Sequence, residues 1–407
     1  MTFFKRTIKD VPVDRKTVLI RADYNVPLNK AGEISDDLRI RASLPTIENL
    51  LKRHCKVVIM SHLGRPEGRD KALSLEPIAE RLSELLGRKV IFVEDTIGDV
   101  VVQAVKQAPS NAVILLENLR YYTEEEANDE AFAKNIAEST GARYFVQDGF
   151  GVVHRAHAST DAITHYIPSV SGLLLEREYV TITNAMENPQ RPLVTVMGGA
   201  KVSDKITVIE RFVDIADKII IGGAMANTFL KYKGHDVGAS MVEDGQESVL
   251  DKIYSAAHEK LDSSVDEFII LPNDLAVAET LSEDAKRRNV TLGEIQSTDK
   301  ALDIGDASIA QVAEEIKNAK TVIWNGTLGY AELPEFAHGS ARLALELASN
   351  PEITSIIGGG DTADFVLKWD GEGGKSFTHV STGGGASLEL MAGKKLPGIE
   401  SLLDASR

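Results

Sequence analysis

Arginine recurs with other polar side chains at four places in the first half of the chain, each directly after a short apolar run. These segments are residues 21–25, 61–66, 117–120 and 148–155, and Arg39 and Arg41 follow the first of them. A guanidinium group binds phosphate or carboxylate through two parallel hydrogen bonds, so several arginines at one crevice would hold a small, multiply charged anion. A surface ion pair is a more common role than a ligand for any single arginine, but the repetition at four strand ends favours an anion site.

Glycine takes the place of arginine at the corresponding positions in the second half. Glycine-rich segments follow five apolar runs, at residues 198–201, 222–223, 325–326, 358–362 and 383–385. Glycine lets the backbone approach a ligand and aim N–H groups at phosphate oxygens, above all at the start of a helix. One such segment would be an ordinary turn, whereas five along one sheet edge predict a site of nucleotide type.

Three charged residues beside these glycines have types that suit phosphate or a metal. Lys201 and Lys205 are four residues apart, so on a helix both ammonium groups would face one phosphate, although a solvated helix face explains them equally well. Asp361 lies where a carboxylate would hold magnesium beside a phosphate loop, and a helix cap is its ordinary explanation. Residues 358–363 also match the loose G-x-G-x-x-A pattern of dinucleotide-binding proteins, but the acidic residue expected about 20 positions later is absent.

The apolar runs alternate with amphipathic segments almost from end to end. We expect strands at residues 17–22, 56–61, 89–93, 112–117, 143–148, 193–197, 218–222, 267–271, 321–325, 353–358 and 377–381. We expect helices at residues 40–53, 76–86, 129–140, 173–187, 202–216 and 307–319. Near-continuous apolar strands are typical of parallel sheets covered on both faces. The alternation therefore predicts an α/β protein with two doubly wound, Rossmann-like domains.

Two segments near the middle of the chain divide the series of strands. Residues 168–172 end the first series and residues 188–192 open the second, with the helix between them as the connection. We therefore expect one domain at 1–170, a connecting helix at 171–188, a second domain at 189–395 and a tail at 396–407. Ligands of such sheets bind beyond the carboxyl ends of the strands, which predicts an interdomain cleft.

The composition excludes several classes of protein. The 407 residues include 45 Lys+Arg and 61 Asp+Glu, for a formal net charge of −16, which disfavours nucleic acid and anionic membranes as partners. The single cysteine, Cys55, excludes an intrachain disulfide and a cysteine-based zinc site. We see no export signal and no apolar stretch of about 20 residues, so we expect a cytoplasmic protein.

An arginine-type anion site on one domain and a glycine-type nucleotide site on the other suggest phosphoryl transfer. Such catalysis consists mostly of positioning and charge neutralisation, and closure of the domains would exclude water. Two alternatives remain open at this point. One is an NAD-dependent dehydrogenase, from the pattern at residues 358–363, and the other is a non-catalytic two-domain protein that traps an anion.

The same segments resemble, in order, the motifs of the phosphoglycerate kinase family, over essentially the whole chain. They are residues 21–28, 61–66, 116–120, 154–159, 198–205, 324–326, 358–362 and 382–389. The resemblance implies reversible phosphoryl transfer between 1,3-bisphosphoglycerate plus ADP and 3-phosphoglycerate plus ATP, as in glycolysis, by a monomer that closes about a hinge. It further implies that the first domain binds 3-phosphoglycerate, that the second binds the magnesium nucleotide, and that the tail packs on the first domain.

The resemblance also implies roles for individual residues. The residues implied for 3-phosphoglycerate are Asp23, Asn25, Arg39, His62, Arg65, Arg120 and Arg155. Those implied for the nucleotide are Gly199, Ala200, Lys201, Lys205, Gly223, Asn325, Glu332, Gly360, Asp361 and Thr362, with Asp361 as the magnesium ligand. Those implied to act on the transferring phosphoryl group are Arg39, Lys205, Gly383, Gly384 and Gly385.

The chain departs from the family pattern at several positions. Thr327 stands where the family usually has proline, Tyr330 replaces a smaller aliphatic residue near the base, and Asn227 replaces phenylalanine. Residues 147–150 read Gln-Asp-Gly-Phe in place of Asn-Asp-Ala-Phe. The first three departures lie in the nucleotide domain, so they bear on nucleotide preference and affinity.

Overall fold

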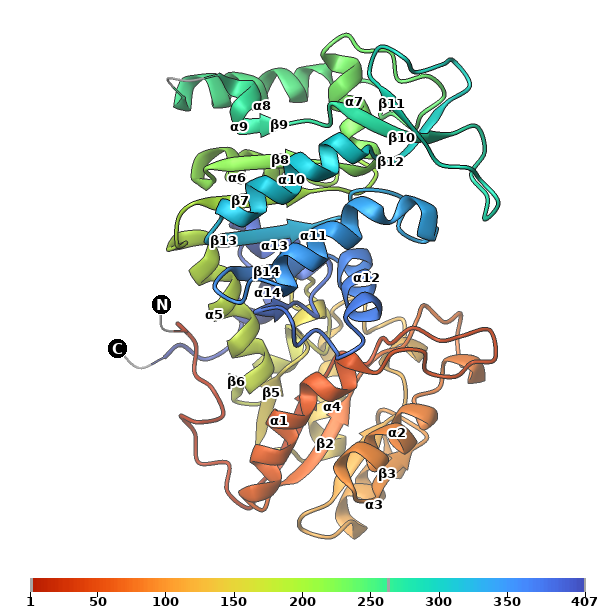
Figure 1. Ribbon diagram of the computed structural model, residues 1–407. Coiled ribbons are helices and arrows are strands. Elements are labelled where there is room, and N and C mark those ends of the chain that lie inside the picture. The colour runs from red at the N-terminus through yellow and green to blue at the C-terminus, as the bar shows by residue number, and fades with distance from the viewer. Residues whose placement is uncertain (1–2, 262–263, 406–407) are drawn as a thin grey trace. The chain divides into compact units, whose positions relative to one another are not determined.

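The structure is a computed structural model that describes residues 3–261 and 264–405. The chain folds into two compact units, residues 1–180 with 395–407 and residues 181–394. Helix α5 (Leu173–Glu187) contains the point at which the chain passes from the first unit to the second (Figure 1).

The first unit is built on a six-stranded sheet in which every neighbouring pair is parallel, in the order β3-β4-β2-β1-β5-β6. Its strands are β1 (Thr17–Arg21), β2 (Lys56–Met60), β3 (Val90–Val93), β4 (Val113–Leu116), β5 (Tyr144–Gln147) and β6 (Ser169–Ser171). Its longer helices are α1 (Leu38–Lys52), α2 (Glu76–Leu86), α3 (Asp99–Gln107) and α4 (Glu130–Thr140). Helix α1 contacts α2 and α3 contacts α4, as in a doubly wound fold.

β-branched residues explain why these segments become buried strands. Val18 and Ile20 of β1 and Val57 and Ile59 of β2 are fully buried in one hydrophobic core. Branching at Cβ restricts the side chain and suits it to the pleated surface of a sheet. The four central strands, in the order β4-β2-β1-β5, are the ones that the arginine segments follow, so the fold places those segments at one sheet edge.

Residues 397–403, near the end of the chain, pack on the first unit. Helix α14 (Pro397–Glu400) brings the Gly398 N–H to the carbonyl of Val153 at 2.9 Å. A Cβ added to Gly398 would lie 3.0 Å from the Cα of Val153, so the two backbones are in close contact. Farther on, the Leu403 N–H donates to the carbonyl of Ser169 at 3.0 Å.

The second unit has its own six-stranded parallel sheet, in the order β15-β14-β13-β7-β8-β9. Its strands are β7 (Leu193–Met197), β8 (Lys218–Ile221), β9 (Ile269–Ile270), β13 (Thr321–Asn325), β14 (Thr354–Gly358) and β15 (His379–Val380). Its helices are α6 (Ile206–Ile215), α7 (Gly223–Tyr232), α8 (Glu247–Lys260), α9 (Val265–Phe268), α10 (Asp306–Asn318), α11 (His338–Ala348), α12 (Gly360–Asp370) and α13 (Gly385–Met391). Helix α6 contacts α8 and α13, whereas α10 contacts α11, and Figure 1 shows α10 and α11 on the viewer's side of the sheet.

A three-stranded antiparallel sheet in the second unit is an addition that the sequence did not predict. It has the order β11-β10-β12, from β10 (Asp274–Ala278), β11 (Arg288–Thr291) and β12 (Lys300–Ile304). Strand β11 buries only Val290, so it lacks the apolar run that marks the other strands. Residues 168–172, which we expected to end the first series of strands, contain the edge strand β6 of the first sheet.

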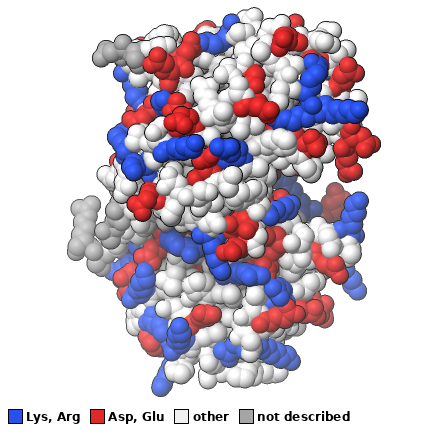
Figure 2. Space-filling view, in the orientation of Figure 1, with Lys and Arg blue, Asp and Glu red and all other residues white. Residues whose placement is uncertain are grey.

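The predicted fold class is confirmed: two parallel sheets, each with its own helices, make up the α/β chain. Acidic and basic side chains are interspersed on the face shown in Figure 2. Among the described residues, no helix combines the length and the apolar character that crossing a membrane requires.

Candidate active site

Arg39 and Asp23 form the first part of a polar cluster in the first unit. Asp23 follows β1, and its carboxylate lies 3.0 Å from Nη1 of Arg39, the second residue of α1. The same Nη1 donates to the carbonyl of Asn25 at 3.0 Å, and the Asn25 side-chain oxygen accepts from the Gly64 N–H at 2.8 Å. These bonds tie the segments after β1 and β2 to the start of α1 and leave Arg39 half-buried.

His62 and Arg120 lie deeper in the same cluster. Burial lowers the pKa of His62 well below its usual value, and the positive charges of Arg21, Arg120 and Arg39 act in the same direction. The Arg120 guanidinium donates to the carbonyl of Gly64 at 2.7 Å and pairs with Glu126 at 2.9 Å.

Arg65 and Arg155 are exposed and complete the cluster. Both act electrostatically on Arg120, and each contributes to lowering its pKa, although burial is the larger cause. The fold therefore brings together all seven residues that the sequence suggested for an anion: Asp23, Asn25, Arg39, His62, Arg65, Arg120 and Arg155. Arg41, by contrast, points away and pairs with Asp37 at 2.6 Å on the helix surface.

Two glycine segments of the second unit pack directly against each other. A Cβ added to Gly198, after β7, would lie 2.0 Å from the carbonyl oxygen of Thr327. A Cβ added to Gly326, after β13, would lie 2.3 Å from the Gly198 carbonyl. No other residue fits at either position, because the adjacent strands deliver the two loops to the same point.

Lys205 is held inside this glycine-rich edge. Its Nζ donates to the carbonyls of Gly198 at 2.7 Å and Asn325 at 3.1 Å. Burial lowers the pKa of Lys205 to about 8, and the charge of Asp361 opposes the shift. An ammonium group bound only to neutral carbonyls is ready to pair with an incoming anion.

Lys201 does not share this position, and the prediction of a helix from residue 202 was wrong. Helix α6 begins at Ile206, Lys205 is its N-cap, and Lys201 is exposed in the preceding turn. The N–H groups of Val202 and Ser203 donate to Glu243 Oε2 at 2.7 and 3.1 Å, which holds this turn in place before the helix.

The start of α12 offers backbone donors beside a side chain that lacks a partner. Thr362 accepts a hydrogen bond from the Gly326 N–H at 2.7 Å, which joins α12 to the loop after β13. Asn325 is 3% exposed, and its Nδ2 has no hydrogen-bond partner in the described structure. A Cβ added to Gly359 would lie 3.3 Å from that nitrogen, so the donor lies beside the turn that opens the helix. An unsatisfied buried donor at a helix N-terminus indicates a position for an anion.

The remaining predicted residues at this edge differ in their exposure and in whether their N–H groups already donate to another residue. Asp361 and Glu332 are exposed, which leaves their carboxylates accessible to a metal or a hydroxyl. The Gly383 N–H already donates to Ser381 Oγ at 3.0 Å, whereas Gly384 and Gly385 form the start of α13. Gly199 and Gly223 are held by hydrogen bonds from their N–H groups to Thr327 and Leu328, and Ala200 follows Gly199.

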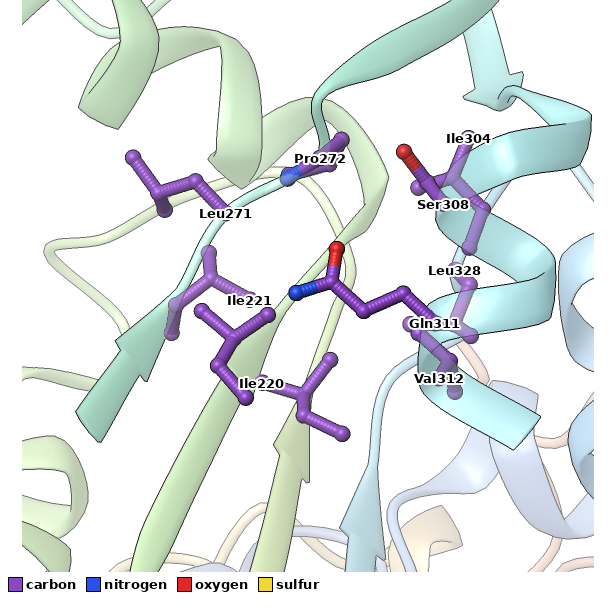
Figure 3. A pocket seen from close by; sticks show the side chains of 10 residues that line it. Ile220, Ile221, Leu271, Pro272, Ile304, Ser308, Gln311, Val312 and Leu328 are labelled. Atoms are coloured by element: carbon purple, nitrogen blue, oxygen red, sulfur yellow. The ribbon is translucent and has the colours of Figure 1, made fainter. Parts of the chain in front are cut away.

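A small apolar pocket backs this edge. It lies between β8, the end of β9 and α10, with Ile220, Ile221 and Leu271 among its lining residues and the amide of Gln311 reaching across it (Figure 3). Leu328 lies between the pocket and the glycines, since a Cβ on Gly222 would come within 2.4 Å of it. The pocket offers mainly hydrocarbon, so it is no site for phosphate.

Sequence reasoning missed three residues that support these clusters. Glu125 is completely buried between the exposed Glu124 and Glu126, in a run that looks like solvated surface. Ser159 and Glu243 make their contacts to residues far away in the chain. Ser159 ends the motif at 154–159 but was given no role there, and nothing in a single sequence separates Glu125 or Glu243 from their neighbours. Within the described ranges, no three His, Cys, Asp or Glu side chains are grouped as ligands for a metal.

Comparison with known proteins gives a consistent result. The family model described as phosphoglycerate kinase matches residues 8–394. A phosphoglycerate kinase of Dictyoglomus turgidum is 45% identical over 403 residues, covering 98% of this chain and 99% of its own. One of Microcystis aeruginosa is 47% identical over 395 residues, covering 96% of each.

Solved structures agree with the sequence relatives. The structure of phosphoglycerate kinase from Coxiella burnetii matches with a TM-score of 0.83 and 37% identity over 98% of both chains. The crystal structure of the Pyrococcus horikoshii phosphoglycerate kinase gives a TM-score of 0.83 and 32% identity, again over 98% of both.

Proposed function

This chain belongs to the phosphoglycerate kinase family, and we propose that its two units divide the substrates of that reaction between them. The enzyme is a kinase that transfers a phosphoryl group reversibly between 1,3-bisphosphoglycerate plus ADP and 3-phosphoglycerate plus ATP. One observation carries the division: charged donors follow the strands of the first sheet, whereas backbone glycines follow those of the second. Membership of this family excludes the dehydrogenase and the passive anion trap as alternatives.

The first unit would hold the phosphoglycerate. This ligand carries a phosphate and a carboxylate, and the exposed Arg65 and Arg155 with the half-buried Arg39 supply forked donors for both. Asp23 and Asn25 would bind its polar groups between them, and Asp23 at the same time fixes the Arg39 side chain.

The second unit would hold the nucleotide. The N-terminus of α12 and the unpartnered Nδ2 of Asn325 support a phosphate position there, and Lys205 lies close enough to Asp361 to interact with it electrostatically. Lys201 would contact the phosphates from solvent, and Glu332 would bind the ribose hydroxyls.

Magnesium would arrive with the nucleotide. Mg²⁺ is commonly held by one or two carboxylates together with phosphate oxygens and water. The exposed Asp361, in the first turn of α12, fits that requirement. When bound, the ion would offset charge on the phosphate oxygens.

Catalysis would rest on charge neutralisation. In the ATP-consuming direction the nucleophile is the 3-phosphoglycerate carboxylate, which is ionised at neutral pH and needs no general base. Arg39, Lys205 and the N–H groups at 383–385 would stabilise the charge on the transferring phosphoryl group. The Gly383 N–H would exchange its bond with Ser381 for one to the phosphoryl oxygen.

We further propose that transfer requires the two units to approach each other, because reacting atoms must come within about 3–3.5 Å. The enzyme would act as a cytoplasmic monomer, without nucleic acid or membrane as a partner.

Formation of ATP from 1,3-bisphosphoglycerate and MgADP tests the function directly. We expect saturable, magnesium-dependent turnover, and NAD should neither bind nor be reduced. Absence of turnover by the correctly folded protein would contradict the assignment.

Replacing Arg39 tests its role in the transfer. Loss of one such donor should lower turnover by about 10²–10³-fold, as for other transition-state donors. The matched control is Arg41→Ala, because Arg41 lies two residues away on the same helix but pairs with Asp37. Near-normal turnover of a folded Arg39→Ala enzyme would exclude the role.

A further inference from the structure

A buried chain of hydrogen bonds runs from Glu125 to His62 in the first unit. Glu125 Oε1 accepts from Ser159 Oγ at 2.5 Å, and its Oε2 accepts from the Ser159 N–H at 3.0 Å. Ser159 Oγ in turn accepts from Arg21 Nε at 2.8 Å. Arg21 Nη2 lies 3.1 Å from His62 Nδ1. Exposed fractions of 0% for Glu125 and Ser159, 1% for Arg21 and 4% for His62 show that water does not compete for these bonds.

The direction of the last bond fixes the proton of the His62 ring. A guanidinium group has five donors and no acceptor, so the bond between Arg21 and His62 exists only if Nδ1 is unprotonated. A neutral ring must then carry its proton on Nε2. A protonated ring would bring two donors face to face, which the geometry disfavours.

The surrounding charges also keep the ring neutral. Burial lowers the pKa of His62 well below its usual value, and Arg21, Arg120, Arg39 and His157 lower it further. His157, which faces Glu125 at 3.9 Å, has its own pKa lowered to about 4 by burial and by Arg21.

Several bonds prevent the Arg21 guanidinium from turning away. Nη1 donates to the carbonyl of Ala22 at 2.5 Å, while Nε is held by Ser159. Glu125 and Asp23 supply negative charge that offsets part of the cost of burying this cation. Arg21 is therefore committed to the protein and has little freedom to contact a ligand itself.

We propose that Arg21 is a positioning residue that locks His62 as the neutral tautomer with its proton on Nε2. Ser159 and Glu125 hold the guanidinium in the required orientation. The consequence, which rests on the proposed function, is that Nε2 of His62 becomes a fixed donor to an oxygen of the phosphoglycerate. The arginines would then neutralise the charge of the ligand, and the hydrogen bond from His62 would orient it.

The tautomer can be read in the free enzyme by nitrogen NMR. We expect the full chain with ¹⁵N-labelled histidine to show His62 protonated at Nε2 and not titrating between pH 5.5 and 8, with His62→Gln identifying its signals. A ring protonated at Nδ1, or one that becomes doubly protonated near its usual pKa, would overturn the proposal. Since no substrate is present, this result does not depend on the enzymatic assignment.

Two variants then connect the tautomer to substrate binding. Arg21→Lys keeps the charge beside Glu125, but one ammonium group cannot reach Ser159 and His62 together, and Ser159→Ala removes the acceptor for Nε. We expect mixed tautomers in both, with the KM for 3-phosphoglycerate raised about tenfold and the KM for MgATP unchanged. The matched control is Ser169→Ala, a buried serine whose hydroxyl donates to Ile167 instead.

The outcomes separate a positioning role from a structural one. Folded variants that keep the Nε2 tautomer would overturn the proposal, as would a raised KM for 3-phosphoglycerate without a change of tautomer. If Arg21→Lys does not fold, Ser159→Ala and the wild-type spectrum decide. Absence of all turnover in a wild-type enzyme with the expected spectrum would instead refute the proposed function alone.

Discussion

Lys205 is a basic residue whose burial disfavours its charged form. Its ammonium group donates to the carbonyl oxygens of Gly198 and Asn325, and burial lowers its pKa to about 8. Lys201, four positions earlier, is exposed. Two lysines that look equivalent in the sequence therefore differ in burial, and the lowered pKa of Lys205 can be measured as proton uptake.

Binding of MgADP should make Lys205 take up a proton. At pH 8.5 much of Lys205 is neutral in the free enzyme, and a nearby phosphate favours the charged form, so its pKa rises on binding. Calorimetry at pH 8.5 in buffers of different ionisation enthalpy should show uptake of a fraction of a proton. The uptake should disappear in Lys205→Met and persist in Lys201→Met. Equal uptake by wild type and Lys205→Met would show that another group titrates.

At the scale of elements, one carboxylate determines the shape of the turn before α6. Glu243 Oε2 accepts from the N–H groups of Val202 and Ser203, and its Oε1 accepts from the Ser203 hydroxyl. The turn that these bonds hold precedes α6, which begins at Ile206 with Lys205 as its N-cap. The turn owes its conformation to a side chain about 40 residues away in the sequence.

Removing Glu243 should weaken the binding of the nucleotide, which we propose for the second unit, and leave the binding of the phosphoglycerate unchanged. We expect Glu243→Ala to raise the KM for MgADP about tenfold, since hydrogen bonds to a charged group are lost and the turn must be ordered at binding. The KM for 1,3-bisphosphoglycerate should not change. Asp244→Ala is the control, because the neighbouring Asp244 is exposed and pairs with Lys231. A change in both KM values would point to a general loss of structure.

The elements that the sequence predicted accurately are those with local signals. Helix α2 spans Glu76–Leu86 as expected, because Pro77 suits its first turn and Gly87 ends it with a φ of 60°. The strands with glycine or arginine at their ends were likewise found from a few adjacent residues. Strands β10–β12 and the turn at 201–205 were not, because distant partners determine them. Glu125 and Ser159 were missed for the same reason.

At the scale of the molecule, Asp148 links the first sheet to the helix at which the chain leaves the unit. It follows β5, and its Oδ1 accepts from the N–H groups of Leu174 and Leu175 at the start of α5, at 3.0 and 3.4 Å. A Cβ on Gly172 would lie 2.0 Å from that oxygen, so the carboxyl group is tightly enclosed. Burial raises its pKa to about 7, against the opposing effect of a hydrogen bond from Thr46.

The stability of the enzyme should therefore depend on the ionisation of Asp148. In the folded state the Asp148 carboxyl group keeps its proton up to about pH 7, whereas in the unfolded chain it releases the proton near pH 3.8. The contribution of this tighter proton binding to the free energy of unfolding is therefore complete below pH 3.8 and is lost as the pH rises to 7. Asp148→Asn cannot ionise. In urea unfolding from pH 4.5 to 8, the variant should gain stability relative to wild type up to pH 7 and not beyond. Parallel curves over this range would show that the carboxyl group is ionised throughout in the folded protein.

The division of ligands between two units makes a last prediction about the whole enzyme. Under the proposed division, each substrate alone would be bound by one unit, by arginines in the first or by glycine loops and Lys205 in the second, so neither alone would supply much free energy for bringing the units together. With both bound, closure as proposed would let Arg39 and Lys205 contact the transferring phosphoryl group at once, and water would be excluded only then. X-ray scattering should therefore show a smaller radius of gyration with 3-phosphoglycerate and a non-hydrolysable MgATP analogue together than with either one. Lys205→Met should weaken this compaction, whereas Arg41→Ala should not. Equal radii in all four ligand states would mean that transfer occurs without closure.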